Sequence, residues 1–287
     1  MAEDVIKEEA SAYSLGSIIH NRQVVEGLSG RGLKVIDDIG KVREGCIVIS
    51  SHGISPYRAE EIRKRSLKMV DTTCPFVRNA QDIAGHLSRE GYRVIIAGDA
   101  NHPEVKALVD FARFARGIRS PQTKADLAGK KACVVKDAKG VKALHLKPKE
   151  KIGVLSQTTQ AMDDFLPVVR AVIEARSAGL RVFNTICKDA EERQRSAKEL
   201  ARGVDMMLIV GGANSANTKR LFDVCKKITR SSHLIETGKD LKSKWFNGVK
   251  TIGITSGAST PDWIVKSVAN EVKLKLRKKG RLQTVNG

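Results

Sequence analysis

The sequence predicts an α/β protein built from parallel β-sheets. Short apolar stretches that suit strands alternate along the whole chain with stretches that suit helices. The strand predicted at residues 46–50 is continuously apolar up to Ile49, which is typical of a strand covered on both faces in a parallel sheet. Polar motifs follow the strands, at the edge where such sheets bind ligands. Because one sheet cannot bring so many strand ends together, we expect several small sheets that face a common centre.

Composition limits the classes of protein to consider. The 287 residues contain no apolar run near the ~20 residues that a membrane span needs, and no signal peptide is visible. Five cysteines, an odd number, fit a reducing compartment better than a disulfide scaffold. We therefore expect a soluble, cytoplasmic protein that does not bind membranes.

The formal net charge of +19 indicates an anionic partner, either nucleic acid or a phosphorylated substrate. The basic residues are spread along helices and loops, and aromatic residues make up only 4% of the chain. We interpret most of this charge as a solvated basic surface, and we do not expect nucleic acid to be the partner.

The first quarter of the chain leads to a cysteine between a strand and a helix. We predict helices at residues 2–10, 23–28, 58–65 and 77–90, and strands at residues 13–15, 33–36, 46–50 and 67–70. Asn21 suits the cap of the second helix, and Pro75 suits the first turn of the fourth. Cys74 then lies at a helix N-terminus, where a thiolate is stabilised. A small buried residue is the simpler interpretation of any lone cysteine.

The same alternation continues to the end of the chain. We predict strands at residues 93–97, 132–135, 152–155, 180–183, 206–210 and 250–254, and helices at residues 161–175, 190–201 and 261–279. The lysine-rich region at residues 117–149 is harder to assign, and we interpret residues 136–149 as a mobile surface insertion.

Chemistry-bearing side chains gather at the ends of these strands. They are His20, His52, Cys74, His102 with Glu104, Thr158 with Thr159, Cys187, Ser215 with Asn217, and Ser259. A structural role is the simpler interpretation of each histidine alone, but the set predicts one composite site. Histidines, hydroxyls and amides at helix N-termini suit an anion. A carboxyl group in a desolvated pocket can act as an acid, which is the role we assign to Glu104.

Two junction cysteines far apart in sequence suit a metal centre. An iron–sulfur cluster needs thiolates, and a cluster with three cysteine ligands leaves one iron open to substrate. Zinc held by cysteine and histidine is the alternative, but the chain has no CxxC and no HExxH motif. The spacing of Cys74 and Cys187 does not decide between the two metals.

Taken together, the motifs resemble 4-hydroxy-3-methylbut-2-enyl diphosphate reductase, the LytB/IspH family. They occur in the family's order and cover nearly the whole chain. The motifs are His20-Asn21, Ser51-His52-Gly53, Thr73-Cys74-Pro75, Asn101-His102-Pro103-Glu104, Gln157-Thr158-Thr159, Thr185-Ile186-Cys187, Asn214-Ser215-Ala216-Asn217 and Ser256-Gly257-Ala258-Ser259. Each tripeptide is common, but the joint set is highly specific.

The resemblance implies an iron–sulfur oxidoreductase of the non-mevalonate isoprenoid pathway. Its last step reductively removes a hydroxyl group from the diphosphate substrate and gives isopentenyl and dimethylallyl diphosphates, with ferredoxin or flavodoxin as electron donor. It also implies three α/β subdomains around a central cluster, which we place at residues 1–74, 75–184 and 185–287.

The resemblance also assigns roles to individual residues. Cys74 and Cys187 are expected to bind a 4Fe–4S cluster. Glu104, His102 and Thr158 are expected to surround the substrate hydroxyl group, with Glu104 as the proton source. The diphosphate is expected to lie among His20, His52, His102, Ser215, Asn217 and Ser259.

The chain departs from the family at its start. The family opens with a strand and a Gly-Phe-Cys-x-Gly-Val motif that carries the first cluster cysteine, and this chain begins after that point. Cys46, Cys133 and Cys225 do not replace this cysteine, because two lie in expected strands and one in the middle of a helix. We also expect the missing strand to leave a sheet edge unpaired.

Two hypotheses follow for activity. The first is a reductase that is shortened or whose true start lies upstream. The second is an inactive relic that keeps the anion pocket and binds RNA through its basic surface. Retention of Glu104, His102 and Thr158 favours the reductase, because a binding relic has no need of a proton donor.

Overall fold

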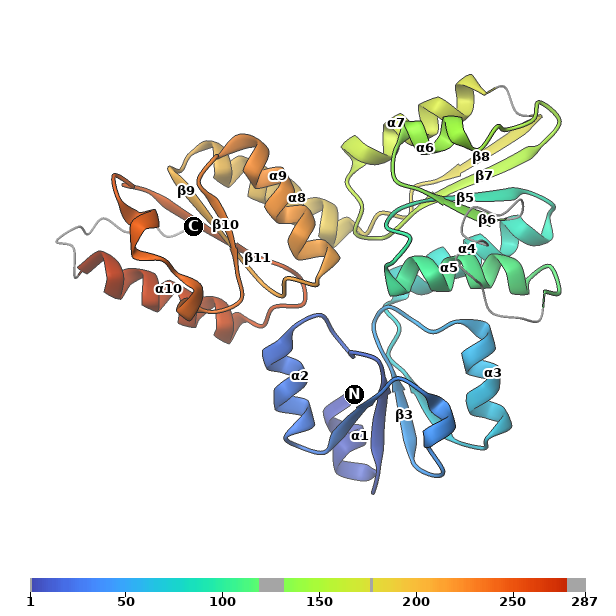
Figure 1. Cartoon of the computed structure of the whole chain (residues 1–287), viewed down its shortest axis with the longest axis horizontal. Coiled ribbons are helices and arrows are strands. Elements are labelled where there is room, and N and C mark those ends of the chain that lie inside the picture. Colours follow the sequence, from blue (N-terminus) through green and yellow to red (C-terminus); the bar gives the residue numbers. More distant parts are fainter. Residues whose placement is uncertain (1, 119–131, 176–177, 278–287) are drawn as a thin grey trace. The chain divides into compact units, whose positions relative to one another are not determined.

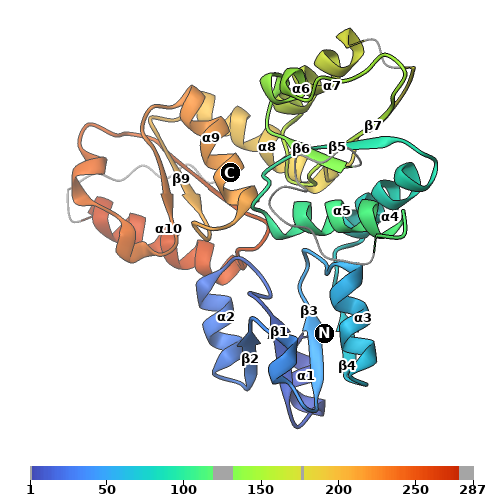
Figure 2. The same ribbon diagram turned by 45° about the vertical axis from the view of Figure 1, so that its right-hand side comes forward.

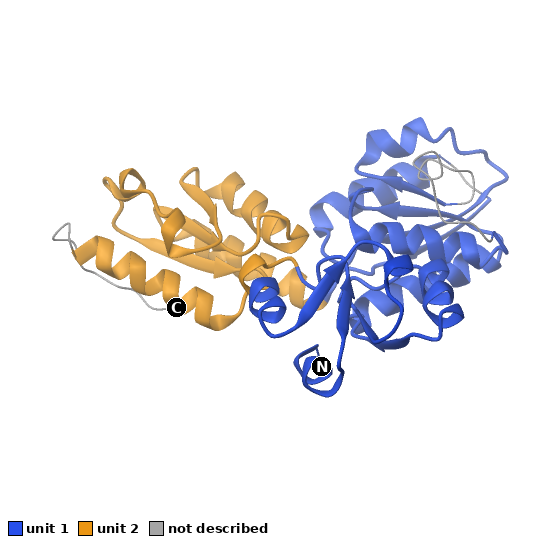
Figure 3. Cartoon of the chain, turned by 60° about the horizontal axis from the view of Figure 1, so that its bottom comes forward, with its two compact units in different colours: residues 1–19, 24–187 blue, residues 20–23, 188–287 orange. Residues whose placement is uncertain are grey.

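The computed structural model describes residues 2–118, 132–175 and 178–277, and its strands in these ranges form three parallel sheets. This confirms the predicted α/β class. The chain forms two compact units, shown in Figure 3: unit 1 comprises residues 1–19 and 24–187, and unit 2 comprises residues 20–23 and 188–287. The division into three subdomains at residues 74 and 184 stays a prediction.

The first sheet of unit 1 has the strand order β2-β1-β3-β4, all parallel (Figure 2). Its elements are α1 (Ala2–Glu8), β1 (Ala12–Leu15), α2 (Arg22–Ser29), β2 (Leu33–Ile36), β3 (Cys46–Ile49), α3 (Pro56–Lys64) and β4 (Lys68–Asp71). Residues of α1 and α2 pack on one face, and Ile62 of α3 packs on the other. The inner strand β1 pairs with β2 on one side and with β3 on the other, with Ala12 opposite Cys46.

The second sheet of unit 1 has the order β6-β5-β7-β8. Its elements are α4 (Pro75–Arg89), β5 (Arg93–Ala97), α5 (Pro103–Phe114), β6 (Ala132–Val135), α6 (Ala138–Ala143), β7 (Lys151–Ser156), α7 (Met162–Glu174) and β8 (Gly179–Phe183). Helices α4 and α5 cover one face, and α6 and α7 cover the other (Figure 1). The interpretation of residues 136–149 as a mobile insertion is wrong, because Asp137 caps α6 and Val141 is buried in the core.

Unit 2 contains one sheet with the order β10-β9-β11. Its elements are α8 (Lys188–Arg202), β9 (Met206–Val210), α9 (Ala216–Ile228), β10 (Ser232–Ile235), η3 (Gly238–Asp240), η4 (Ser243–Phe246), β11 (Ile252–Ser256) and α10 (Asp262–Arg277). The central strand β9 is fully buried, with α8 and α9 on one face and α10 on the other. None of the described helices is long and apolar enough to cross a membrane.

The predicted strands are close to those observed. The strands at residues 33–36, 93–97, 132–135 and 206–210 agree to the residue. The last strand begins two residues later than predicted, at Ile252. The Asp205 carboxylate explains this shift, because it accepts the backbone N–H groups of Lys250 and Thr251 at 2.8 Å and holds them outside the ladder. The helices α5 and α6 and the strand β10 have no counterpart among the predicted elements, and α9 was expected only as a helix around Cys225.

Candidate active site

Cys74 lies where the sequence predicts, between β4 and α4. It is the N-cap residue of α4, Pro75 occupies the first turn, and its thiol is partly exposed. The Cys74 N–H group donates to the carbonyl oxygen of Ser51 at 3.1 Å. This bond joins the Cys74 turn to the loop that follows β3.

The Cys74 turn is fixed from its other side by Asp71. The Asp71 carboxylate accepts hydrogen bonds from the Thr73 N–H group at 2.9 Å and from the Thr73 hydroxyl group, and it pairs with Arg78. Burial alone would raise the pKa of Asp71, but these hydrogen bonds and the guanidinium charge outweigh it, so the pKa is lowered. Asp71 is therefore a stable anion that holds the turn before Cys74.

His52 and His102 meet in unit 1. Their rings lie edge to face with centroids 5.3 Å apart. The loop that carries His52 needs glycine at the next position, because Gly53 has φ +78° and a Cβ there would lie 2.2 Å from Nε2 of Gln81. His102 is the N-cap of α5, and its Nδ1 accepts the Glu104 N–H group at 3.2 Å. This bond places the proton of a neutral His102 ring on Nε2.

Glu104 is a fully buried carboxyl group with a precise partner. Its Oε1 accepts the Thr158 N–H group at 2.7 Å, and its Oε2 accepts the Thr158 hydroxyl group at 2.8 Å. Burial raises the pKa of Glu104 from 4.5 to about 7, although the two bonds from Thr158 act to lower it. A carboxyl group with this pKa can hold and release a proton near neutral pH.

Cys187 lies next to Thr158. Its N–H group donates to the Thr158 carbonyl oxygen at 2.8 Å, and its thiol is partly exposed. The contacts in unit 1 therefore run from Cys74 through the Ser51-His52 loop to His102, and from Glu104 through Thr158 to Cys187. The structure brings these predicted residues of unit 1 into one continuous set.

The other three cysteines are placed as the sequence predicts. Cys46 lies in β3, Cys133 in β6 and Cys225 in α9, and all three are buried. Burial raises the pKa of Cys46, and it raises the pKa values of Cys133 and Cys225 to about 11. All three thiols are buried within a strand or a helix, where they pack as small core residues.

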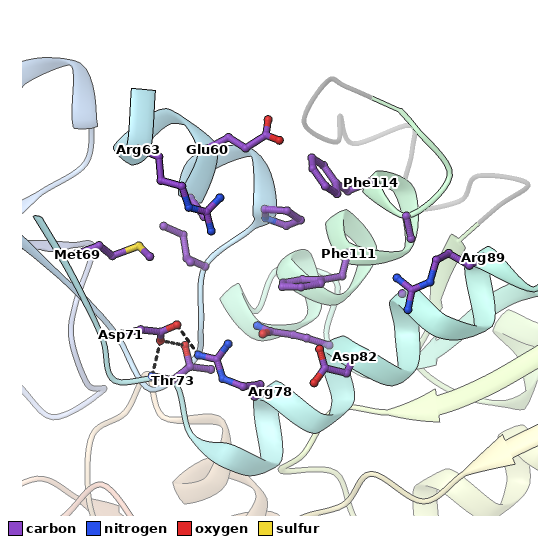
Figure 4. A pocket seen from close by; sticks show the side chains of 16 residues that line it. Glu60, Arg63, Met69, Asp71, Thr73, Arg78, Asp82, Arg89, Phe111 and Phe114 are labelled. Atoms are coloured by element: carbon purple, nitrogen blue, oxygen red, sulfur yellow. Dashed lines mark hydrogen bonds and ion pairs between the residues drawn. The ribbon is translucent and has the colours of Figure 1, made fainter. Parts of the chain in front are cut away.

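A cavity of about 360 Å³ lies beside the Cys74 turn in unit 1 (Figure 4). Phe111 and Phe114 of α5 form part of its wall. Its charged lining residues are Glu60, Arg63, Asp71, Arg78, Asp82 and Arg89. Carboxylates and guanidinium groups are equal in number, so charge favours neither an anion nor a cation. None of the predicted site residues is among the described residues that line it.

The remaining predicted residues gather in unit 2, around the C-terminal ends of β9 and β11. Ser215 is the N-cap of α9, and its side chain accepts the Thr218 N–H group at 3.3 Å. The preceding loop packs closely on His20, because a Cβ on Gly212 would lie 2.1 Å from the His20 carbonyl oxygen. Burial lowers the pKa of His20, and the charge of Lys219 lowers it further. His20 is thus held in its neutral form.

Several buried polar atoms in unit 2 are left unused. The amide nitrogen and oxygen of Asn217, the Thr218 hydroxyl group and the Ser259 hydroxyl group have no hydrogen-bond partner within the described ranges. Buried polar groups are normally paired, so a cluster of unpaired ones indicates a missing polar ligand. Here it lies at the N-terminus of α9, which favours an anion. Thr218 was missed by the sequence analysis, although it directly follows the Asn-Ser-x-Asn motif.

Comparisons with known proteins identify the family of the chain. Residues 1–273 match the family model described as LytB protein. A 4-hydroxy-3-methylbut-2-enyl diphosphate reductase of Geobacter metallireducens is 40% identical over 273 residues, covering 95% of this chain and 90% of the relative. The corresponding enzyme of Pelobacter propionicus is 41% identical over 272 residues, with the same two coverages.

Two solved structures show the same fold. One, a structure of (E)-4-hydroxy-3-methyl-but-2-enyl diphosphate reductase described as the terminal enzyme of the non-mevalonate pathway, has 37% identity and a TM-score of 0.66, and the match covers 95% of this chain and 92% of the other. The other, the E-1-hydroxy-2-methyl-but-2-enyl-4-diphosphate reductase from Plasmodium falciparum, has 26% identity and a TM-score of 0.84, with coverages of 94% and 80%. On the family model and these relatives, the chain belongs to the LytB family.

Proposed function

We propose that the chain is a reductase of the non-mevalonate isoprenoid pathway that converts 4-hydroxy-3-methylbut-2-enyl diphosphate to isopentenyl and dimethylallyl diphosphates. Removing the hydroxyl group as water takes two electrons and two protons. The observation that carries the proposal is the buried Glu104, with a pKa of about 7, held by Thr158 next to Cys187. Relatives that carry this reductase name support it.

Unit 1 handles the proton in this proposal. Glu104 in its protonated form donates to the departing hydroxyl group, and Thr158 orients the carboxyl group through both of its oxygens. His102 fixes the start of α5 and thereby the position of Glu104. The rings of His52 and His102 are assigned to the substrate as hydrogen-bonding groups.

Unit 2 holds the diphosphate in this proposal. The N-terminus of α9 supplies a favourable dipole, and Ser215, Asn217 and Ser259 supply hydroxyl and amide groups. A diphosphate would pair the buried atoms of Asn217 and Ser259 that the chain itself leaves unpaired. His20 contributes a ring held in its neutral form.

The cysteines fit an iron–sulfur cluster only in part. A cluster with one open iron takes three thiolates. The sequence contains five cysteines, and the structure buries three of them, which leaves Cys74 and Cys187 as the partly exposed thiols. These two residues are the proposed cluster ligands, and the cluster would supply electrons received from ferredoxin or flavodoxin. These two thiolates are one fewer than a cluster with an open iron takes.

The second candidate is an inactive member that keeps the anion pocket and uses its basic surface to bind RNA, and the net charge of +19 is the observation that favours it. The two candidates predict different salt dependence. Binding to RNA phosphates falls steeply with salt, because each contact releases counterions. We expect only weak, non-specific RNA binding at physiological salt, measured by fluorescence anisotropy. A tight, sequence-selective complex would favour the RNA-binding candidate over the reductase.

Anaerobic iron and sulfide analysis, together with turnover of the diphosphate substrate, tests the reductase. Because only Cys74 and Cys187 are partly exposed thiols, we expect a labile, substoichiometric cluster and low turnover. Cys187→Ala should remove the bound iron, whereas Cys225→Ala, the matched control in a buried helix, should not. Full cluster occupancy with normal turnover would show that another residue supplies the third ligand. Complete absence of iron binding and turnover under reconstitution would contradict the proposed activity for this chain.

A further inference from the structure

In the loop between β9 and α9, one peptide group makes hydrogen bonds through both its carbonyl oxygen and its N–H group. The Gly212 carbonyl oxygen accepts the Ser215 N–H group at 2.9 Å. The N–H group of the same peptide, on Ala213, donates to Oε1 of Glu236 at 2.8 Å. Because Ser215 caps α9, fixing this peptide also fixes the start of the helix and the position of Asn217.

Glu236, which follows β10, is itself anchored through its backbone. Its N–H group donates to Oδ2 of Asp240 at 2.9 Å, and its carbonyl oxygen accepts the side-chain amide of Gln23 at 3.0 Å. The Thr237 N–H group shares the same Asp240 oxygen. Glu236 therefore has its main chain fixed on two sides while its carboxylate reaches the loop.

We propose that Glu236 is a positioning residue for the anion site of unit 2. Its carboxylate holds the Gly212–Ala213 peptide and thereby places Ser215 and Asn217 for binding the diphosphate. This inference rests on the proposed function, in which unit 2 binds that group.

The Glu236 carboxylate has two opposite effects on an anion bound nearby, and substitutions can separate them. Its negative charge repels a diphosphate, whereas its hydrogen bond to Ala213 organises the loop. Glutamine at this position keeps an oxygen acceptor and removes the charge. If positioning is the role, Glu236→Gln should bind an anion at least as well as the unchanged chain, and Glu236→Ala should bind it less well.

Asp205 provides a matched control. Its carboxylate also accepts backbone N–H groups in unit 2, from Lys250 and Thr251, but at the N-terminal end of β11, away from the strand end that carries Ser259. Asp205→Ala therefore removes a comparable structural bond without touching the loop. A purely structural role for Glu236 predicts the same behaviour from both alanine variants.

The experiment uses the full chain and inorganic pyrophosphate as the probe, so no cluster or turnover is needed. Isothermal titration calorimetry measures the Kd of pyrophosphate, and hydrogen exchange measures protection of the Ala213 amide. We expect Glu236→Ala to raise the Kd about tenfold and to lose protection at Ala213. Glu236→Gln and Asp205→Ala should keep both properties.

Two results would overturn the positioning role of Glu236. An unchanged Kd and unchanged protection in Glu236→Ala would overturn the proposal, as would Glu236→Gln behaving like Glu236→Ala. If the unchanged chain does not bind pyrophosphate, the diphosphate role of unit 2 fails. In that case protection of Ala213 still decides whether Glu236 holds the loop.

Discussion

The proton donor proposed in unit 1 and the anion-binding groups proposed in unit 2 differ in how far the chain itself supplies their hydrogen-bond partners. In unit 1, both oxygens of the buried Glu104 carboxyl group accept hydrogen bonds from Thr158. In unit 2, the amide of Asn217 and the hydroxyl group of Ser259 have no partner among the described residues. A group that must keep a defined proton state needs fixed partners, whereas a group that must bind a ligand is left ready for it. The difference separates the proposed chemistry from the proposed binding.

Glu104→Gln provides the strongest test of this separation. The amide cannot release a proton, so turnover should fall about 10²-fold or more relative to the unchanged chain at equal iron content. Affinity for pyrophosphate should stay the same, because Glu104 is not among the residues proposed to hold the diphosphate. Steady-state turnover and calorimetry measure the two quantities.

A matched control for this substitution is Glu90→Gln, which removes an exposed carboxylate of unit 1 that pairs with Arg181. It should leave turnover unchanged. Near-normal turnover in Glu104→Gln with bound iron would remove Glu104 from its role as proton donor.

The raised pKa of Glu104 also predicts a dependence of stability on pH. Its pKa is about 7 in the folded chain against 4.5 for the ordinary group. Between these values the folded state holds a proton that the unfolded state has lost, so the contribution of Glu104 to stability falls as pH rises, by about 1.4 kcal/mol per pH unit. It is fully present below pH 4.5 and lost above about pH 7.

Urea denaturation at a series of pH values measures this effect. The difference in free energy of unfolding between the unchanged chain and Glu104→Gln should slope with pH only between those two pKa values. Parallel stability curves across this range would show that Glu104 does not take up a proton on folding.

The positions of Cys74 and Glu104 in the fold could be predicted from the sequence, because strand ends and helix starts are local features. Cys74 and Glu104 each follow an apolar strand and sit at a proline-marked helix start, and the structure places both there. The continuous apolar pattern of β9 likewise fixed its bounds to the residue. Hydrophobic periodicity, the positions of prolines and the ends of strands can be predicted from the sequence without knowledge of the tertiary fold.

The rest depends on contacts between distant residues. Thr158 meets Glu104 across 54 positions of sequence, and Glu236 meets Ala213 across 23. Strand β10 begins with the polar residues Ser232 and His233, which give no strand pattern, and it is a strand because β9 pairs with it. Which buried groups are satisfied, and which are left for a ligand, follows only from such pairings.

Thr158→Val should therefore reduce stability. Valine has nearly the shape of threonine but cannot donate to Oε2 of Glu104, which would leave a buried oxygen unpaired. We expect a loss of about 1–3 kcal/mol in the free energy of unfolding at neutral pH. Thr159→Val, at the half-buried neighbouring position where the hydroxyl group accepts from Gln157, should cost less. Equal losses would mean that the Glu104 pair is no more important than a surface contact.

Asn217→Ala, unlike Thr158→Val, should change ligand affinity and leave stability almost unchanged. The Asn217 amide is buried without partners within the described ranges, so removing it breaks no hydrogen bond and relieves two unpaired atoms. Alanine also favours the helical conformation of α9. The free energy of unfolding should therefore change by less than about 0.5 kcal/mol, or rise, while affinity for pyrophosphate falls about tenfold. A large loss of stability would show that Asn217 serves the fold, and the distinction between a satisfied unit 1 site and an open unit 2 site would no longer hold.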